Sequence, residues 1–186
     1  MRIIAGDFRG RSLTSVGKGD EGAHLRPTTD RTRESLFNML EGGRFGDPIE
    51  NAQVLDLFSG TGALSFESLS RGATHATLVD DGRTALGLIR ANIKLLGVAD
   101  RSTVIKRDAR RLPPCTSTPA TLVFLDPPYG KDMGAPALLN ARAGGWIAPR
   151  ALIVWEESSQ QPAPDGFTFL DARKYGDTTV TLLEAE

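Results

Sequence analysis

A short apolar run that ends in an acidic residue and two prolines constrains this chain of 186 residues more than any other feature. Residues 122–125 read Leu-Val-Phe-Leu, which is typical of a strand buried on both faces of a parallel sheet. Asp126, Pro127, Pro128 and Tyr129 follow at once. Each proline fixes its own φ and pushes the residue before it away from the helical region. The sequence therefore predicts a buried strand with a rigid loop at its carboxyl end.

The groups in this loop suit a planar base that carries an exocyclic amino group. Extended backbone at Asp126 and Pro127 leaves their carbonyl groups free to face a ligand. The Asp126 carboxylate is a further acceptor, and Tyr129 adds a flat ring. A loop in which the prolines merely end the strand is the alternative that this stretch leaves open.

A strand, loop, helix and second strand are predicted in that order between residues 53 and 80. Gly60 and Gly62 follow the first strand, and glycines let the backbone turn into a helix close to a ligand. Asp80 ends the second strand, twenty residues after Gly60, where an acidic residue is expected to accept hydrogen bonds from ribose hydroxyls. This pattern predicts a cofactor that contains a nucleoside.

Two features favour S-adenosylmethionine over a nicotinamide dinucleotide. The dinucleotide fingerprint has a third glycine where this chain has Ser65. Asp56 precedes Gly60 by four residues, and its charge suits the amino group of a methionine moiety better than a pyrophosphate. We therefore predict that S-adenosylmethionine is the cofactor. Phe58, which lies in the same loop, is a further candidate cofactor-binding residue. Asp108, which follows a third predicted strand, is a candidate acceptor for the adenine amino group or else an ordinary loop acid.

Length and composition indicate one α/β domain with a small appendage. The chain has 40% apolar and 24% charged residues, one cysteine and two histidines. No intramolecular disulfide can form, and no zinc-ligand spacing exists, so we expect no metal. No apolar run approaches the length of a membrane span, and the N-terminus has no apolar core of a signal peptide. We therefore expect a cytoplasmic protein without membrane association.

The charge is concentrated at the N-terminal end, although the net charge is only −1. The first 18 residues carry four basic side chains and one acidic one, which are Arg2, Arg9, Arg11, Lys18 and Asp7. Short strands over 2–5 and 11–14 predict a basic hairpin in residues 1–24, ahead of a main domain over 25–186. A polyanion would meet this end of the molecule. A solvated basic tail is the alternative.

More arginines lie where a helix is predicted to begin. Thr29 or Asp30 can cap this helix. The three arginines at its start suit phosphate or a cofactor carboxylate, with surface ion pairs as the alternative; they are Arg26, Arg31 and Arg33. The residues predicted to face the core are Leu36, Phe37 and Leu40.

The remaining patterns complete a sheet with helices on it. The further predicted strands cover 76–79, 102–105, 151–156, 167–174 and 178–183, and the last two form a hairpin. The further predicted helices cover 83–96 and 135–143. Asn92 lies in the apolar stripe of the first of these helices, so we expect it to make structural hydrogen bonds.

Five stretches in order resemble a family of bacterial 16S ribosomal RNA guanine-N2 methyltransferases, the small-subunit methyltransferase D family. These stretches are residues 1–6, 25–31, 56–64, 126–129 and 173–177. The resemblance implies a Rossmann-like, seven-stranded class I methyltransferase sheet with one antiparallel strand, plus an N-terminal β-hairpin for RNA. It also implies methyl transfer from S-adenosylmethionine to the N2 amino group of one guanine, on partly assembled small-subunit particles. Relatives often have glutamate at the position of Asp80.

The resemblance and the residues together assign roles along the chain. The catalytic assignments are Asp126, Pro127 and Tyr129. The cofactor assignments are Asp56, Phe58, Gly60, Gly62, Asp80 and Asp108. The RNA-binding assignments are Arg2, Arg9, Arg11, Arg26 and Arg31. An adenine-N6 DNA methyltransferase, a protein glutamine methyltransferase and a non-catalytic RNA-binding assembly factor remain as alternatives, with a dehydrogenase as a remote one.

Overall fold

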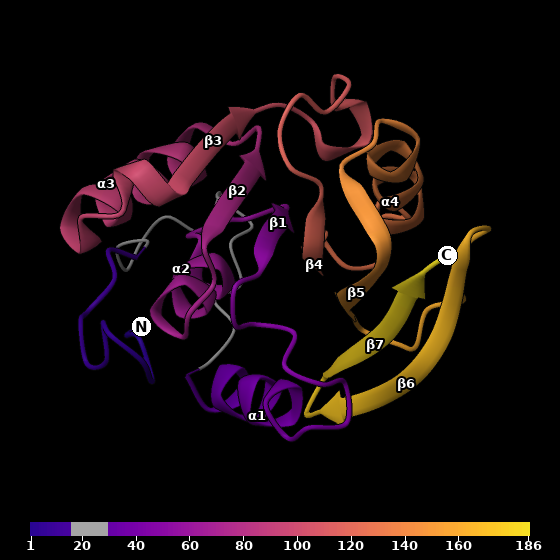
Figure 1. The fold of residues 1–186 in the computed structure, drawn as a ribbon, viewed down its shortest axis with the longest axis horizontal. Helices are drawn as coiled ribbons and strands as arrows, with labels where there is room; N and C mark the ends of the chain where they lie inside the picture. The colour runs from indigo at the N-terminus through magenta and orange to yellow at the C-terminus, as the bar shows by residue number, and fades with distance from the viewer. Residues whose placement is uncertain (16–29) are drawn as a thin grey trace.

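The chain folds around one seven-stranded sheet of order β3-β2-β1-β4-β5-β7-β6 in a computed structural model that describes residues 1–15 and 30–186 (Figure 1). The strands are β1 (Gln53–Leu57), β2 (His75–Asp80), β3 (Ser102–Lys106), β4 (Ala120–Leu125), β5 (Ile147–Glu157), β6 (Phe167–Tyr175) and β7 (Thr178–Ala185). The ladders from β3 to β5 are parallel, whereas β7 is antiparallel to both of its neighbours. This confirms the predicted class I methyltransferase sheet with a single reversed strand.

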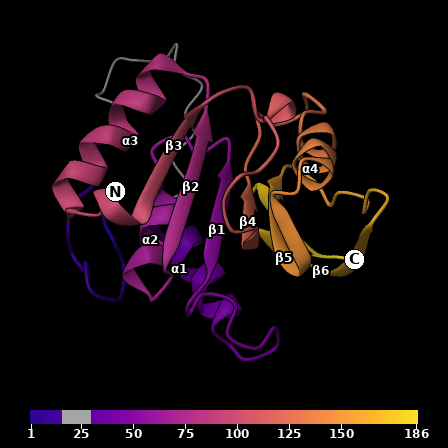
Figure 2. The ribbon, with the colours of Figure 1, turned by 45° about the horizontal axis from the view of Figure 1, so that its top comes forward.

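Helices cover both faces of the sheet. The α-helices are α1 (Asp30–Leu40), α2 (Ala63–Ser70), α3 (Arg83–Leu96) and α4 (Gly134–Ala143), and short 3-10 turns lie at η2 (Ala99–Arg101) and η3 (Ala109–Arg111). Helices α1, α2 and α3 contribute to one apolar cluster, and α4 to the other (Figures 1 and 2). The core residues predicted in α1, which are Leu36, Phe37 and Leu40, are fully buried.

Strand β4 shows why its sequence is continuously apolar. Leu122 and Phe124 belong to the cluster with α1, α2 and α3. Val123 and Leu125 point the other way and belong to the cluster with α4. All four are buried, because helices cover both faces at this central strand.

Strand β5 begins four residues earlier than the sequence predicts. Ala120 pairs with Ile147, and the register then shifts so that Leu122 pairs with Leu152. Arg150, within the shifted part, has a φ of 63° and is exposed. Pro149 and this irregular turn of the backbone break the apolar pattern, which is why the pattern marks only the second half of the strand.

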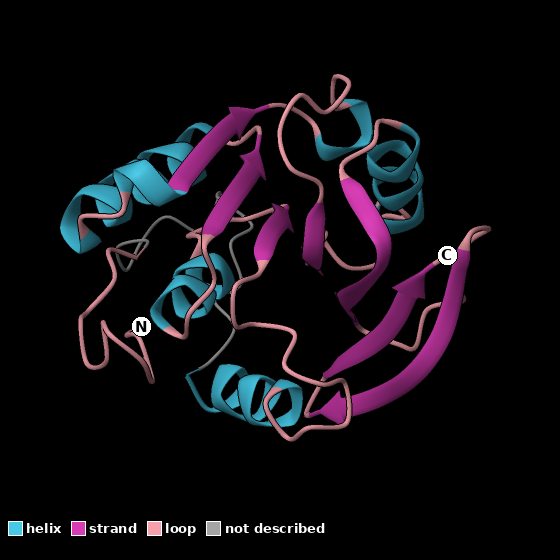
Figure 3. Ribbon diagram, viewed as in Figure 1, coloured by secondary structure: helices cyan, strands magenta, loops and turns pink. Residues whose placement is uncertain are grey.

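The N-terminal hairpin forms, but its two predicted strands are wrong. One antiparallel bridge joins Arg2 and Ser12, and residues 1–15 are otherwise drawn as loop (Figure 3). The reason is that the Ile4 and Ala5 N–H groups donate to the Glu67 carboxylate in α2, at 2.8 and 3.0 Å. Those two donors therefore belong to a side chain and not to a strand ladder.

Further contacts hold the hairpin against α2 and α3, where it lies in both views (Figures 1 and 2). The Asp7 N–H donates to the Ser70 carbonyl at 2.8 Å. A Cβ at Gly6 would collide with that carbonyl, and Gly6 has a φ of 76°. Asn92 in α3 accepts from the Thr14 N–H at 2.7 Å and donates to the Thr61 carbonyl at 3.1 Å. The structural role predicted for Asn92 is confirmed.

Candidate functional site

The carboxyl ends of neighbouring parallel strands bring four acidic residues to one edge of the sheet. Asp56 lies near the end of β1, and Asp80 ends β2. Asp126 follows β4 directly, and Glu156 is the second-last residue of β5. In open α/β sheets, ligands bind outside this edge, where strand order reverses beside the first strand.

The loop after β1 is held by its own hydrogen bonds. Phe58 has a φ of 65°, which is rare for a residue with a side chain and turns the backbone out of the strand. The Ser59 N–H donates to the Val79 carbonyl at 3.0 Å, and the Gly62 N–H donates to the Ser59 carbonyl at 2.7 Å. A Cβ at Gly62 would come within 2.8 Å of Leu78. The backbone therefore turns into α2 in a shape that requires glycine there.

Asp80 lies directly against this loop. Its carboxylate accepts from the Gly60 N–H at 2.9 Å and from the Gly82 N–H at 2.8 Å, through different oxygens. Burial raises the pKa of Asp80. Each oxygen keeps a second lone pair, so the carboxylate can still accept from the hydroxyls of a ribose. The donor and acceptor set therefore fits a nucleoside cofactor at this point.

Asp56 is a buried carboxylate, with 2% of its surface exposed. The Ser65 hydroxyl donates to Asp56 Oδ2 at 2.7 Å. Burial raises the pKa of Asp56 to about 7, and a cation beside it would stabilise the ionised form. Ser65 occupies the place of the third glycine of a dinucleotide fingerprint. The residue that argued against a dinucleotide is thus a hydrogen-bond partner of Asp56.

The loop after β4 is fixed at both ends. The Asp126 N–H donates to the Leu57 carbonyl at 3.3 Å, which joins this loop to the end of β1. The Gly130 N–H donates to Glu157 Oε1 at 2.7 Å, and the Tyr129 and Thr178 hydroxyl oxygens are 3.0 Å apart in a hydrogen bond. Glu157 and Thr178 were missed in the sequence, because their partners lie 27 and 49 residues away.

Asp126 and Tyr129 have strongly perturbed acidities. The pKa of Asp126 is raised well above its usual value, first by burial and then by the charges of Glu156, Asp56 and Glu157. Burial also raises the pKa of Tyr129 to about 12. Pro127 is buried and Pro128 exposed. Perturbed carboxyl groups at the ligand-binding edge of an α/β sheet are candidates for chemistry.

Asp108 lies at the same edge but is engaged in its own turn. It caps η3, accepting from the Arg110 N–H at 2.9 Å and forming an ion pair with the Arg110 guanidinium at 2.7 Å. Arg110 holds the pKa of Asp108 below its usual value. An adenine amino group bound there would share these oxygens with Arg110.

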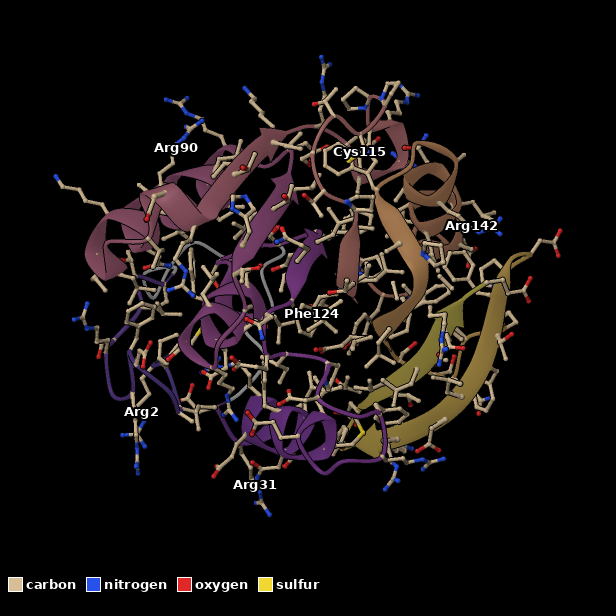
Figure 4. All side chains as sticks on the ribbon, in the orientation of Figure 1. Arg2, Arg31, Arg90, Cys115, Phe124 and Arg142 are labelled. Atoms are coloured by element: carbon tan, nitrogen blue, oxygen red, sulfur yellow. The ribbon has the colours of Figure 1, made fainter. Side chains whose placement is uncertain are left out.

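Of the arginines predicted to bind RNA, all but Arg26 lie in the part of the chain that the structure describes. Arg2, Arg9, Arg11 and Arg31 are exposed, and the Arg2 and Arg31 side chains point outward (Figure 4). Arg2 Nε lies 3.8 Å from Asp30 Oδ2, so the hairpin meets the start of α1. A cavity of about 220 Å³ lies between them, lined by Arg2, Ile3, Ile4, Arg9, Gly10, Asp30 and Glu34. Arg26 lies outside the described residues.

Arg33 is not available to a phosphate. Its side chain is fully buried, 3.0 Å from Asp30 Oδ1 and 3.8 Å from Glu67 Oε2. It also donates to the Arg2 carbonyl. The alternative of ion pairing is therefore confirmed for Arg33, although the pair is in the interior and not on the surface.

Comparison with known proteins agrees with the fold and shows the family of the chain. The family model described as "Conserved hypothetical protein 95" matches residues 1–184. The chain is 37% identical over 164 residues to "Ribosomal RNA small subunit methyltransferase D" of Escherichia coli K12, covering 88% of this chain and 78% of that protein. It is 32% identical over 189 residues to the protein of the same name from Haemophilus influenzae, covering 99% and 93%.

A solved structure extends this similarity to three dimensions. The chain resembles "Putative methyltransferase yhhF from Escherichia coli" with a TM-score of 0.82 and 34% identity, over 100% of this chain and 98% of that one. Sheet order and this neighbour agree on a class I methyltransferase fold. Among the described residues, no helix is long and apolar enough to cross a membrane.

Proposed function

Because the chain belongs to the small-subunit ribosomal RNA methyltransferase D family, described as "Conserved hypothetical protein 95", we propose that it methylates 16S ribosomal RNA. The methyl group comes from S-adenosylmethionine, and the acceptor is the exocyclic N2 amino group of one guanine. The RNA is bound within small-subunit assembly particles. The observation that carries the proposal is the hydrogen bond from the Asp126 N–H to the Leu57 carbonyl, which joins the loop after β4 to the end of β1, where the glycine loop begins.

The cofactor assignments follow the chemistry of each side chain. S-adenosylmethionine, when bound, supplies a methyl group activated by a positively charged sulfur. Asp80 accepts from the ribose hydroxyls, with Gly60 beside it, and Asp56 faces the methionine amino group. Gly62 and Phe58 shape the backbone around the ligand. Asp108 accepts from the adenine amino group, in competition with Arg110.

The chain's own contribution to catalysis is mainly positioning. The guanine N2 lone pair is delocalised into the ring, so it attacks poorly unless the amino group is held in line. The Asp126 carboxylate and the Pro127 carbonyl accept hydrogen bonds from the two N–H groups of N2. These hydrogen bonds orient the lone pair and stabilise the positive charge that develops on nitrogen. Tyr129, held by Thr178, stacks on the extruded base.

Labelled-methyl transfer tests the proposal against its alternatives. The protein is incubated with methyl-labelled S-adenosylmethionine and, separately, with free 16S RNA, undermethylated small subunits, DNA and a glutamine-containing protein acceptor. We expect label in the 16S RNA, and more label with the undermethylated small subunits than with free 16S RNA. Label in DNA or protein would favour the other amine methyltransferases. Cofactor binding by calorimetry without transfer to any acceptor would favour a non-catalytic assembly factor, and binding of a nicotinamide dinucleotide would favour a dehydrogenase.

Replacing Asp80 with asparagine is expected to weaken S-adenosylmethionine binding about 10- to 100-fold, because charge-assisted hydrogen bonds are lost. Isothermal titration measures the change. Asp81→Asn is the matched control, because Asp81 is the exposed neighbour and should bind the cofactor as the wild type does. Equal affinities of the two variants would contradict the role of Asp80.

Replacing Arg9 or Arg11 with alanine is expected to raise the KM for RNA several-fold and to leave cofactor affinity unchanged. Each lost phosphate contact should also reduce the salt dependence of RNA binding by about one unit of log–log slope. Arg90→Ala is the control, because Arg90 is an exposed arginine on α3 whose side chain points away from the hairpin (Figure 4). An unchanged KM and salt slope would count against the hairpin as an RNA-binding element.

A further inference from the structure

Glu156 is a buried carboxyl group to which the mechanism above gives no task. On β4 and β5, Phe124 and Val154 are paired and belong to the cluster with α1, α2 and α3. Asp126 and Glu156 lie two residues beyond this pair, so their side chains leave the sheet on the same face. Asp56 on β1 pairs with Phe124 and shares this face. The three carboxyl groups therefore come from adjacent strands to one side of the site.

Among the described residues, neither an ion pair nor a hydrogen bond to Oε1 offsets the cost of burying the Glu156 carboxyl group. Its surface is 2% exposed, and Oε1 has no hydrogen-bond partner among the described residues. A buried, unpaired acceptor is costly, and a buried, unpaired charge more so. Within the described part of the chain, no lysine or arginine forms an ion pair with Asp56, Asp126 or Glu156.

Among the described residues, the charged and titratable groups that act on Asp126 and Glu156 are all acidic. Asp56 comes from β1, Glu157 is the next residue of β5, and Tyr129 belongs to the same loop as Asp126. Burial and the charge of Asp56 raise the pKa of Glu156 to about 7. The charge of Glu156 in turn raises the pKa of Asp126. Because the negative charge of Glu156 disfavours ionisation of Asp126, the two carboxyl groups on this face are expected to titrate as a pair and not independently.

We propose that Glu156 is a positioning residue that shares one proton with Asp126, so that Asp126 can take up the proton released by the substrate amino group. The identity of the substrate rests on the function proposed above, whereas the shared proton is a property of the free protein. Glu156 acts through Asp126 and does not touch the base.

The proton balance of the step is simple. The N2 lone pair forms the new bond to the methyl carbon, while the carbon–sulfur bond breaks and sulfur keeps its electron pair. The nitrogen then carries a positive charge and gives one proton to Asp126. The Asp126–Glu156 pair holds that proton and releases it to solvent. A proton acceptor works best when its pKa lies near the working pH, which is what the second carboxyl group provides.

Direct titration of Asp126 tests the shared proton without any substrate. The protein is labelled with carboxyl-¹³C aspartate, and the Asp126 signal is assigned by its loss in Asp126→Asn. In the wild type we expect a midpoint well above that of an ordinary aspartate. In Glu156→Gln the midpoint should move to lower pH, because a negative charge is gone. Glu156→Asp, which keeps the charge, should retain the raised midpoint and serves as a second variant if Glu156→Gln does not fold.

A control variant separates this effect from general changes to the sheet. Glu184→Gln makes the same chemical change on β7, where Glu184 pairs with Leu152 at the other end of the β5–β7 ladder. We expect no shift of the Asp126 midpoint in Glu184→Gln. An Asp126 midpoint that is the same in Glu156→Gln and the wild type would overturn the proposal.

The pH dependence of methyl transfer provides the second readout. Activity requires ionised Asp126, so it falls on the acid side of the pKa of Asp126. In Glu156→Gln the acid limb of kcat/KM should move to lower pH, and kcat at neutral pH should fall about 10- to 100-fold with little change in the KM for RNA. A uniform fall at every pH, with an unmoved acid limb, would show a merely structural role. If the wild type transfers no methyl group to RNA, the proposed function fails, and the titration alone decides this inference.

Discussion

Asp126→Asn is expected to reduce kcat for methyl transfer by at least about 1,000-fold while the affinity for S-adenosylmethionine changes less than twofold. The amide keeps the shape of the side chain but replaces one acceptor oxygen by a donor. The asparagine side chain can neither accept the hydrogen bond from N2–H as the carboxylate does nor take up the proton that N2 releases. The loop keeps its anchors in this variant, because the hydrogen bonds from Gly130 to Glu157 and between Tyr129 and Thr178 do not involve Asp126.

The measurements are single-turnover transfer to undermethylated small subunits and calorimetric titration of the cofactor. Asp177→Asn is the matched control, because Asp177 is an exposed acidic residue in the turn between β6 and β7. It should retain full activity. A fully active Asp126→Asn would remove Asp126 from the catalytic site, and loss of cofactor binding in that variant would instead indicate a damaged fold.

Glu67→Ala is expected to lower the free energy of unfolding by about 3–5 kcal/mol, a large stability change for one substitution. Glu67 is fully buried in α2 and accepts from the Ile4 and Ala5 N–H groups. It also lies 2.8 Å from Arg71 Nε and 3.8 Å from Arg33 Nε. Alanine would leave the buried Arg33 guanidinium facing Asp30 alone and would free two backbone donors of the hairpin.

Urea unfolding measures the stability change, and amide hydrogen exchange of Ile4 and Ala5 measures release of the hairpin. Glu41→Ala is the control, because Glu41 also pairs with Arg71, at 2.7 Å, but from the surface. It should cost about 1 kcal/mol or less. The KM for RNA should rise in Glu67→Ala, since Arg9 and Arg11 are carried by the released segment. A stability within about 1 kcal/mol of wild type and unchanged exchange would contradict this account of the hairpin.

The strands of the sheet could be predicted because each of them has a hydrophobic pattern within its own short stretch of sequence. Residues 122–125 are apolar without interruption, and the helix predicted over 83–96 has the same bounds in α3. The local pattern predicts only part of β5, because Pro149 and Arg150 interrupt the apolar pattern. The strand continues through these two residues by a shift in its register with β4. The expectation of a seven-stranded sheet with one antiparallel strand came from resemblance to a family, since short-range patterns do not determine how strands pair.

The parts of the site that could not be predicted depend on contacts between distant residues. Glu67 binds the hairpin across 62 and 63 residues, which no local pattern reveals. Glu156 and Glu157 read as the polar end of a strand, yet they leave opposite faces of the sheet. Glu157 holds the Gly130 N–H, whereas Glu156 shares its face with Asp126. Alternation along the strand separates the two glutamates, and the paired register of β4 and β5 shows that Glu156 is the one on the face of Asp126.

The central claim is that the methyl group reaches a guanine N2, and nucleoside analysis of the labelled RNA tests it most directly. Undermethylated small subunits are treated with the protein and methyl-labelled S-adenosylmethionine, and the 16S RNA is digested to nucleosides and separated. We predict that the label elutes with N2-methylguanosine and maps to a single position. Label in N6-methyladenosine or any other nucleoside, or its absence from the RNA, would contradict the account.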